Sequence, residues 1–297
     1  MNSLEKIDLG KLNLLDRLDV ATYLKVKSNL GNPKNYTQKD LKEHVKLIKL
    51  YVKNAIKSKG KVKHLYHYSE TTPESMGGRL FCKTSIQGLD NIVRGYLYRD
   101  TTTDIDFKNM HPMLLAYICE QHDIRCSELD HYNKNRDKIL MNYGDKDSTK
   151  TKILAMVNSE KKGRHNDDYL NKLDKECKEI QNKLQNIEEF KPFLKKAAEV
   201  RPNNILGSFI NRVLCYYENM CLQCVIDVVN SKGIEICAFM FDGLLIYGDH
   251  YENQELLREC EEAVALKFEG SNLKLAYKGH DETITDDLLN DIEVKEE

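Results

Sequence analysis

The sequence predicts an α+β fold built on a small sheet packed against helices. The stretch AFMFDGLLIYGD at 238–249 places an Asp-Gly pair between two apolar runs, which is the pattern of a β-hairpin with a tight primed turn. The stretch YRDTTTDIDF has a strand pattern and leads into a helix with Pro112 in its first turn. The order strand, helix, helical insertion, helix, strand, strand, helix, strand matches the split β-α-β, ferredoxin-like plan.

The bulk composition favours a globular protein. The 297 residues are enough for two or three domains, with 31% charged and 41% hydrophobic residues. No run of 18 apolar residues predicts a membrane span, and the N-terminus lacks the continuous apolar stretch of a signal peptide. The nine cysteines are odd in number, which indicates reduced thiols in an intracellular compartment such as the cytoplasm, a nucleoid or a viral factory.

Residues 1–75 are predicted to be helical and basic. Lysines recur there at gaps of three and four, so on a helix they form one stripe; its members are Lys39, Lys42, Lys46, Lys49, Lys53 and Lys57. Such a stripe is typical of an ordinary solvated helix face, and it also suits a phosphate backbone. We therefore predict a basic nucleic-acid-binding region at the N-terminus.

The remaining chain divides into four further parts. Residues 76–129 contain the first strand and its helix, and residues 130–200 are a polar helical region. Residues 201–280 contain a long apolar helix that ends at Gly233, then the hairpin, a helix and a last strand. Residues 281–297 form an acidic tail that we expect to be loosely held.

Three aspartates are the candidate chemical groups. In the split β-α-β plan the first strand lies beside the hairpin, so Asp104 and Asp106 could meet Asp242. Three converging carboxylates repel one another unless cations occupy the site. We place Asp104 on the opposite face from Asp106 and expect one of the two to be structural. Asp242 by itself could also be a simple turn residue.

The residues around these aspartates resemble a known enzyme family. DIDFKNMHPMLL at 104–115 resembles the Asp-Phe-x-Ser-Leu-Tyr-Pro signature of motif A in family B DNA polymerases. FMFDGLLIYGD resembles motif C, a hairpin tip with the second metal-binding aspartate, and KTKILAMVNSEKKG is similar to motif B of the fingers. The match departs from the family where Gly243 and Leu244 replace the second acid of motif C, and where six residues rather than four separate Lys152 from Asn158.

The resemblance implies a polymerase palm at 76–129 and 201–280, with helical fingers at 130–200. It assigns two Mg²⁺ ions, or Mn²⁺ in their place, to Asp106 and Asp242. It also suggests nucleotide-binding and nucleic-acid-binding side chains. The nucleotide candidates are Arg136, Lys152, Asn158, His111 and Lys150, the last as a rival to Lys152. The nucleic-acid candidates are Arg79 and Arg94, either of which could instead form a structural ion pair.

The predicted function is template-directed nucleotide transfer to a 3′-hydroxyl. A DNA polymerase acting on a template and primer with nucleoside triphosphates is the first choice, in a virus or mobile element and in company with a helicase or other replication proteins. One alternative is a primase or RNA polymerase that uses rNTPs. Another is a palm that has lost activity and only binds nucleic acid. No membrane partner is expected.

Overall fold

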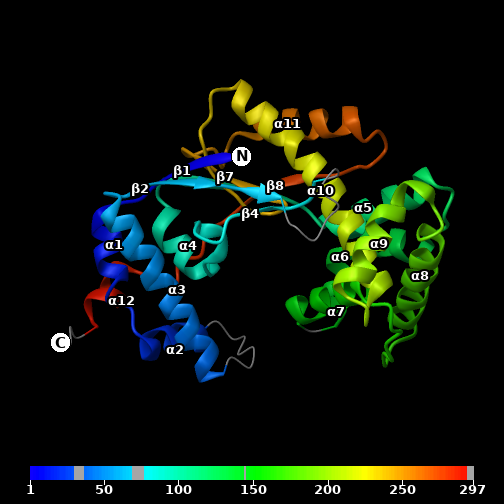
Figure 1. Ribbon diagram of the computed structural model, residues 1–297, viewed down its shortest axis with the longest axis horizontal. Helices are drawn as coiled ribbons and strands as arrows, with labels where there is room; N and C mark the ends of the chain where they lie inside the picture. Colours follow the sequence, from blue (N-terminus) through cyan, green and yellow to red (C-terminus); the bar gives the residue numbers. More distant parts are fainter. Residues whose placement is uncertain (30–36, 69–76, 144, 293–297) are drawn as a thin grey trace.

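A computed structural model describes residues 1–29, 37–68, 77–143 and 145–292, and it combines helices with small sheets (Figure 1). The expected α+β class is confirmed. The expected boundary between residues 75 and 76 lies outside the described ranges.

Four strands form the central sheet in the order β6-β7-β5-β8, and every neighbouring pair is antiparallel. The strands are β5 (Thr102–Phe107), β6 (Ile236–Phe239), β7 (Gly243–Tyr247) and β8 (Leu275–Lys278). As expected, the first strand of this sheet lies directly beside the hairpin, with Asp106 opposite Gly243 in the β5–β7 register. The split order follows because a helical connection joins β5 to β6 and another joins β7 to β8.

Helices cover one face of this sheet. They are α5 (Met110–Gln121), α10 (Ile205–Ser231) and α11 (Gln254–Lys267). Ile105 and Phe107 of β5 point into this core together with Leu244 of β7. Figure 1 shows α10 and α11 lying along the same side of the strands. The long helix α10 is followed by Gly233 with φ of +69°, the left-handed conformation that commonly ends a helix.

The N-terminal helices pack on the opposite face. They are α1 (Leu9–Leu15), α2 (Val20–Asn29), α3 (Gln38–Lys57) and α4 (Asn91–Tyr98). Their buried side chains form a second core that includes Leu245 of β7. Because side chains alternate along a strand, Leu245 faces away from its neighbours Leu244 and Ile246, which lie in the first core.

The expectation of a purely helical N-terminal region is wrong at both of its ends. The strands β1 (Asn2–Lys6) and β2 (Lys61–Leu65) form an antiparallel pair. The buried side chains of β1 are polar, so no alternation of apolar residues marks the strand in the sequence. Glu5 is fully buried, where it accepts hydrogen bonds from the Tyr51 hydroxyl at 2.5 Å and from the Ile86 backbone N–H at 3.0 Å.

Short elements connect the N-terminal region to α4. They are β3 (His67–Tyr68), β4 (Leu80–Phe81), which pairs with β3, and the 3-10 turn η1 (Ile86–Gly88).

The described residues between 127 and 200 are mostly helical, as the sequence predicts for 130–200. The elements are α6 (Ser127–Asn142), α7 (Lys146–Asn158), α8 (Asp168–Leu184), the 3-10 turn η2 (Glu188–Phe190) and α9 (Lys191–Val200). Figure 1 places this group at one end of the molecule and the N-terminal helices at the other, with the sheet between them. Within the described ranges, no helix has both the length and the apolar character needed to cross a bilayer.

The C-terminal segment is held more firmly than expected. Residues Asp286–Asn290 form α12, and Leu289 is fully buried in the second core together with Ile284. Thr285 caps this helix by accepting a hydrogen bond from the Leu288 N–H at 3.2 Å. Two buried apolar side chains, one before the helix and one within it, therefore anchor an otherwise acidic segment.

Candidate active site

Asp106 lies near the end of β5, beside Asp242 in the turn that leads into the paired strand β7. Asp106 is the fifth residue of β5, and Asp242 occupies the hairpin tip between β6 and β7. The backbone N–H of Phe107 donates to the Asp242 carbonyl oxygen at 3.3 Å, which brings the two chain segments together. The two strand ends therefore present their carboxylates side by side.

The hairpin turn differs from the expected Asp-Gly turn by one residue. The Met240 N–H donates to the Gly243 carbonyl at 2.8 Å, so the two central residues are Phe241 and Asp242. Phe241 has φ of +65°, a conformation that usually requires glycine at the first position of a two-residue hairpin loop. Its ring packs 5.4 Å from the Phe81 ring and 5.3 Å from the Arg79 guanidinium. These contacts hold a strained backbone beside Asp242.

Gly243 is required by the close approach of the two strands. A Cβ at this position would lie 2.4 Å from the Ile105 carbonyl oxygen and 3.2 Å from the Asp106 carboxylate. Any side chain larger than hydrogen would push β5 and β7 apart and separate the aspartates. The glycine of the FDG motif therefore serves close packing rather than turn geometry.

The two aspartates repel each other in a partly buried setting. Burial, and next the charge of Asp242, raise the pKa of Asp106 to about 7. Burial, and next the charge of Glu218, raise the pKa of Asp242. Lys278 opposes the rise in the pKa of Asp106, because its ammonium lies 3.6 Å from that carboxylate. Paired carboxylates with so little compensation fit a divalent cation, because their oxygen donors are those that Mg²⁺ and Mn²⁺ prefer.

The expectation that Asp104 faces away from Asp106 is wrong. Residues two apart in a strand point to the same face, and only the intervening Ile105 enters the core on the other side. The charge of Asp104 accordingly contributes to raising the pKa of Asp106. Asp104 itself is raised in pKa by burial, with Lys278 and His280 opposing that effect. Asp104 thus belongs to the same acidic cluster.

A cationic groove begins at Asp106. Its volume is about 700 Å³, and it opens between β5, β8 and the helices α6 and α7. Six cationic side chains line it; they are Lys108, Arg136, Lys146, Lys150, Lys274 and Lys278. Such a lining matches a triphosphate, which needs positive groups around its oxygens. Two of the predicted nucleotide-binding residues, Arg136 and Lys150, lie here.

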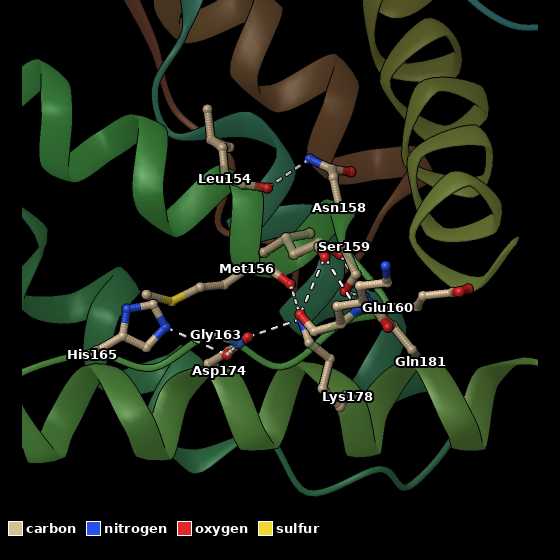
Figure 2. Close-up of polar contacts among 12 residues, drawn as sticks. Leu154, Met156, Asn158, Ser159, Glu160, Gly163, His165, Asp174, Lys178 and Gln181 are labelled. Carbon is tan, nitrogen blue, oxygen red and sulfur yellow. Dashed lines mark hydrogen bonds and ion pairs between the residues drawn. The ribbon is translucent and has the colours of Figure 1, made fainter. Parts of the chain in front are cut away.

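Lys152 and Asn158 do not line this groove. Lys152 is two residues from Lys150 on α7 and so projects from a different side of the helix. The Asn158 side chain donates to the Leu154 carbonyl at 2.9 Å (Figure 2). It also accepts from the Asn211 side chain at 3.3 Å. Of the two lysines predicted to bind the nucleotide, only Lys150 lines the groove together with Asp106.

Arg79 and His111 form a buried cluster with Glu218. The Arg79 guanidinium donates to both carboxylate oxygens of Glu218, at 2.6 and 2.7 Å, and His111 Nε2 lies 2.8 Å from the same carboxylate. Glu218 is fully buried. Burial lowers the pKa of His111, but hydrogen bonds with Cys215 and with Glu218 outweigh that effect and raise the pKa to about 9. The cluster lies close enough to Asp242 to influence its pKa. Arg79 is therefore an ion-pair residue at the back of the site.

His111, Cys215 and Glu218 also have ligand atoms within 4.8 Å of one another. Arg79 already supplies positive charge at this position through its two hydrogen bonds to Glu218. A metal ion would meet the guanidinium there, so the aspartate pair is the better cation site.

Arg94 and the basic stripe have separate environments. Arg94 donates to the Leu89 carbonyl at 2.6 Å, and burial lowers its pKa while Asp104 and Asp90 oppose that effect. Among the described residues Arg94 forms no ion pair, so the structural ion pair that the sequence allowed is not seen, and its nucleic-acid-binding role stays a prediction. The six lysines of the basic stripe are all exposed on α3, whose other side enters the second core. Their binding role stays a prediction.

Four groove lysines were not among the predicted site residues. Lys108 stands inside the motif A-like stretch, and Lys146 stands one turn before Lys150 on α7. Lys274 precedes the last strand and Lys278 ends it, so their even spacing places both on one face. That even spacing was the sequence signal for these two lysines. It could be related to the site only once β8 was known to pair with β5.

Comparison with known proteins gives two similarities. No protein-family model matches the chain. The chain is 26% identical over 238 residues to the "Putative helicase V13" of Sputnik virophage, an alignment that covers 73% of this chain and 29% of that protein. The chain thus spans less than a third of the relative's length. Among solved structures, it aligns with the POL domain of Pol1 from M. smegmatis in complex with DNA primer-template and dNTP. That alignment has a TM-score of 0.45 and 12% identity, over 93% of this chain and 67% of the other.

Proposed function

We propose that the chain is a template-directed nucleotidyltransferase, in the first instance a DNA polymerase that extends a 3′-hydroxyl from nucleoside triphosphates. The observation that carries the proposal is the juxtaposition of Asp106 on β5 with Asp242, which directly precedes the paired strand β7, next to the cationic groove that begins at Asp106. The strand order β6-β7-β5-β8 supports it, because it is the split β-α-β order expected of a polymerase palm.

Asp106 and Asp242 would hold the divalent cations. Two such ions, when bound, stabilise the attacking and leaving oxygens of a phosphoryl transfer. Lys278 balances the charge of Asp106 in the absence of a cation. The neighbouring Asp104 adds negative charge to the same face and is a further candidate ligand.

The groove residues would bind and orient the triphosphate. Lys150 and Arg136 line it from the helical side, and Lys274 and Lys278 line it from the sheet. Positive groups from two rigid walls favour one orientation of the phosphates, and positioning is the main task of a phosphoryl-transfer enzyme.

His111 is a positioning residue in this proposal. It is 8% exposed and bonded to Glu218, so it acts on the hairpin tip through the Arg79–Glu218 pair. Arg79 in turn packs on the ring of Phe241, the residue before Asp242. The cluster would therefore keep the second aspartate in place while substrates exchange.

The remaining surfaces suggest partners. The exposed lysines of α3 would bind the phosphates of a template or primer. The match to part of a larger virophage protein with a helicase name is compatible with action beside a helicase. That the strand is DNA and that the nucleotide sugar is deoxyribose are likewise proposals.

Primer extension with Mg²⁺ tests the proposal directly. The wild type should extend a labelled primer on a template with dNTPs, and Asp106→Ala and Asp242→Asn should each lose at least a thousandfold in rate. Asp249→Asn, at an exposed position after β7, is the matched control and should extend normally. Parallel reactions with rNTPs and without primer separate the polymerase from a primase or RNA polymerase. Extension by Asp242→Asn at the wild-type rate would refute the site assignment.

A further inference from the structure

A basic loop joins α7 to α8 on the far side of the helical group from the sheet. It spans 159–167 and carries Lys161, Lys162 and Arg164, whose side chains are all exposed. Within the described parts of the chain, none of these three cations takes part in an ion pair. The next acidic residue, Asp167, is used to cap α8 by accepting from the Leu170 N–H at 2.8 Å.

A buried carboxylate of α8 fixes the backbone of this loop (Figure 2). Asp174 is only 1% exposed, and it accepts a hydrogen bond from the Gly163 N–H at 2.6 Å. Its carboxylate also lies 3.4 Å from His165 Nε2 and 2.9 Å from the Lys178 ammonium. A buried charge is costly unless it is paired and hydrogen-bonded, and here its partners are the loop and its own helix.

Two more side chains of α8 bind the end of α7. The Lys178 ammonium donates to the Met156 carbonyl at 2.6 Å. The Gln181 amide donates to the carbonyls of Val157 and Ser159, at 2.8 and 3.0 Å. These bonds satisfy carbonyl groups that the end of a helix leaves without intrahelical partners.

The start of α10 holds the loop from the other side. The Glu160 N–H donates to the Asn204 side chain at 2.8 Å, and the Glu160 carboxylate accepts from the Leu206 N–H at 3.1 Å. The contact is close, since a Cβ at Gly207 would lie 2.2 Å from the Asn158 carbonyl oxygen. The loop backbone is thus clamped between two helices, and its one early acid is engaged at the clamp.

We propose that this clamped basic loop binds the phosphates of the single-stranded template that has not yet been copied, on the 5′ side of the nucleotide groove. Three unpaired cations within four residues attract a polyanion, and a fixed backbone lowers the entropy lost on binding. Helix α7 connects the nucleotide groove to the basic loop. Its residues Lys146 and Lys150 line the groove, and the loop begins directly after its last residue, Asn158. At a rise of about 1.5 Å per residue the helix spans roughly 20 Å, or about six nucleotides at ~3.4 Å each.

The strand's identity as template rests on the proposed function, whereas the affinity of the loop for single strands does not. Fluorescence anisotropy across a salt series measures that affinity. The ligands are a primer-template with an eight-nucleotide 5′ overhang and the same duplex with a blunt end. The test variant is K161Q/K162Q/R164Q. Its control, K172Q/K175Q/K183Q, removes the same charge from exposed positions of α8.

The test variant should bind the overhang substrate about 10- to 100-fold more weakly than wild type. The slope of log affinity against log salt should fall by about 2, because single-strand binding releases about 0.7 ion per neutralised phosphate. The control should change affinity less than threefold. Equal losses in the two variants, or no preference of the wild type for the overhang, would overturn the proposal.

Asp174→Asn distinguishes binding by a positioned loop from binding by diffuse positive charge. The substitution makes the protein more positive, so diffuse attraction would tighten binding, whereas loss of the clamp should weaken overhang binding about 3- to 10-fold. Tighter or unchanged binding would overturn the positioning claim. If Asp174→Asn does not fold, the surface triple variant still decides the proposal. Primer extension is measured separately from binding. An enzyme that extends primers but shows no preference for the overhang would refute only the loop proposal. A protein that prefers the overhang but does not extend primers would refute only the proposed polymerase function.

Discussion

Removing one carboxylate of the aspartate pair should stabilise the metal-free protein. Asp106 has its pKa raised to about 7 from an ordinary 3.8, chiefly by burial and next by Asp242. Between those two pH values the folded protein keeps a proton that the unfolded chain has released. The stability of the wild type therefore falls as pH rises through this window, and the loss is complete above pH 7.

The size of the effect follows from the same values. A tenfold change in proton affinity corresponds to about 1.4 kcal/mol, so ionising Asp106 at pH 8 costs the folded state at most about 4 kcal/mol. The side chain is 29% exposed and its ammonium partner Lys278 is 62% exposed, so solvent screening reduces the cost. We expect Asp106→Asn to raise the free energy of unfolding by about 1–2 kcal/mol at pH 8 without metal.

Urea unfolding in EDTA at pH 8 and at pH 5 measures this difference. The gain of Asp106→Asn should be largest at pH 8 and should shrink at pH 5, where the wild-type carboxyl is largely protonated. Mg²⁺ should then reverse the order. A ligand at one hundred times its dissociation constant stabilises by about 2.7 kcal/mol, and only the wild type keeps both carboxylates.

Asp249→Asn is the control, since this exposed aspartate lies outside the cluster and its loss should change stability by less than about 0.5 kcal/mol at either pH. The reasoning is refuted if Asp106→Asn destabilises the metal-free protein at pH 8. It is equally refuted if Mg²⁺ stabilises the variant as much as the wild type.

Three further variants test other parts of the site. Lys150→Ala should raise the KM for nucleotide at least tenfold in steady-state extension, whereas Lys152→Ala should change it less than twofold, because only Lys150 lines the groove. Gly243→Ala should cost more than about 2 kcal/mol in thermal unfolding and abolish extension, whereas Gly279→Ala, whose Cβ would meet nothing within 4 Å, should be neutral within about 0.5 kcal/mol. Glu218→Gln should destabilise by about 3–5 kcal/mol in urea unfolding, because it leaves the partly buried Arg79 and the buried His111 without their carboxylate.

Each of these expectations has a clear opposite. Equal KM changes for the two lysine variants would remove Lys150 from the nucleotide site. An active Gly243→Ala protein would show that β5 and β7 need not approach as closely as the structure has them. A neutral Glu218→Gln would mean that the Arg79 and His111 charges are stabilised by other groups.

The sequence by itself was sufficient to predict several local elements of this protein and the proximity of Asp106 to Asp242. The β5 strand, the helix begun near Pro112 and the apolar hairpin are each encoded within about a dozen consecutive residues, so periodicity and turn chemistry predict them. The aspartates could be paired because the order of elements predicts which strands are neighbours, and β5 does pair with β7. Local patterns were sufficient to predict an element wherever the residues that determine it lie within one segment.

Tertiary structure alone decided which distant residues surround that pair. Arg79 and Glu218 are 139 positions apart, and their ion pair depends on where α10 crosses behind the hairpin. Lys278 reaches Asp106 only because β8 pairs with the other edge of β5. Polar burial hid β1, where Glu5 has its partners on other elements. Such contacts depend on packing between segments, and packing leaves no periodicity within either segment.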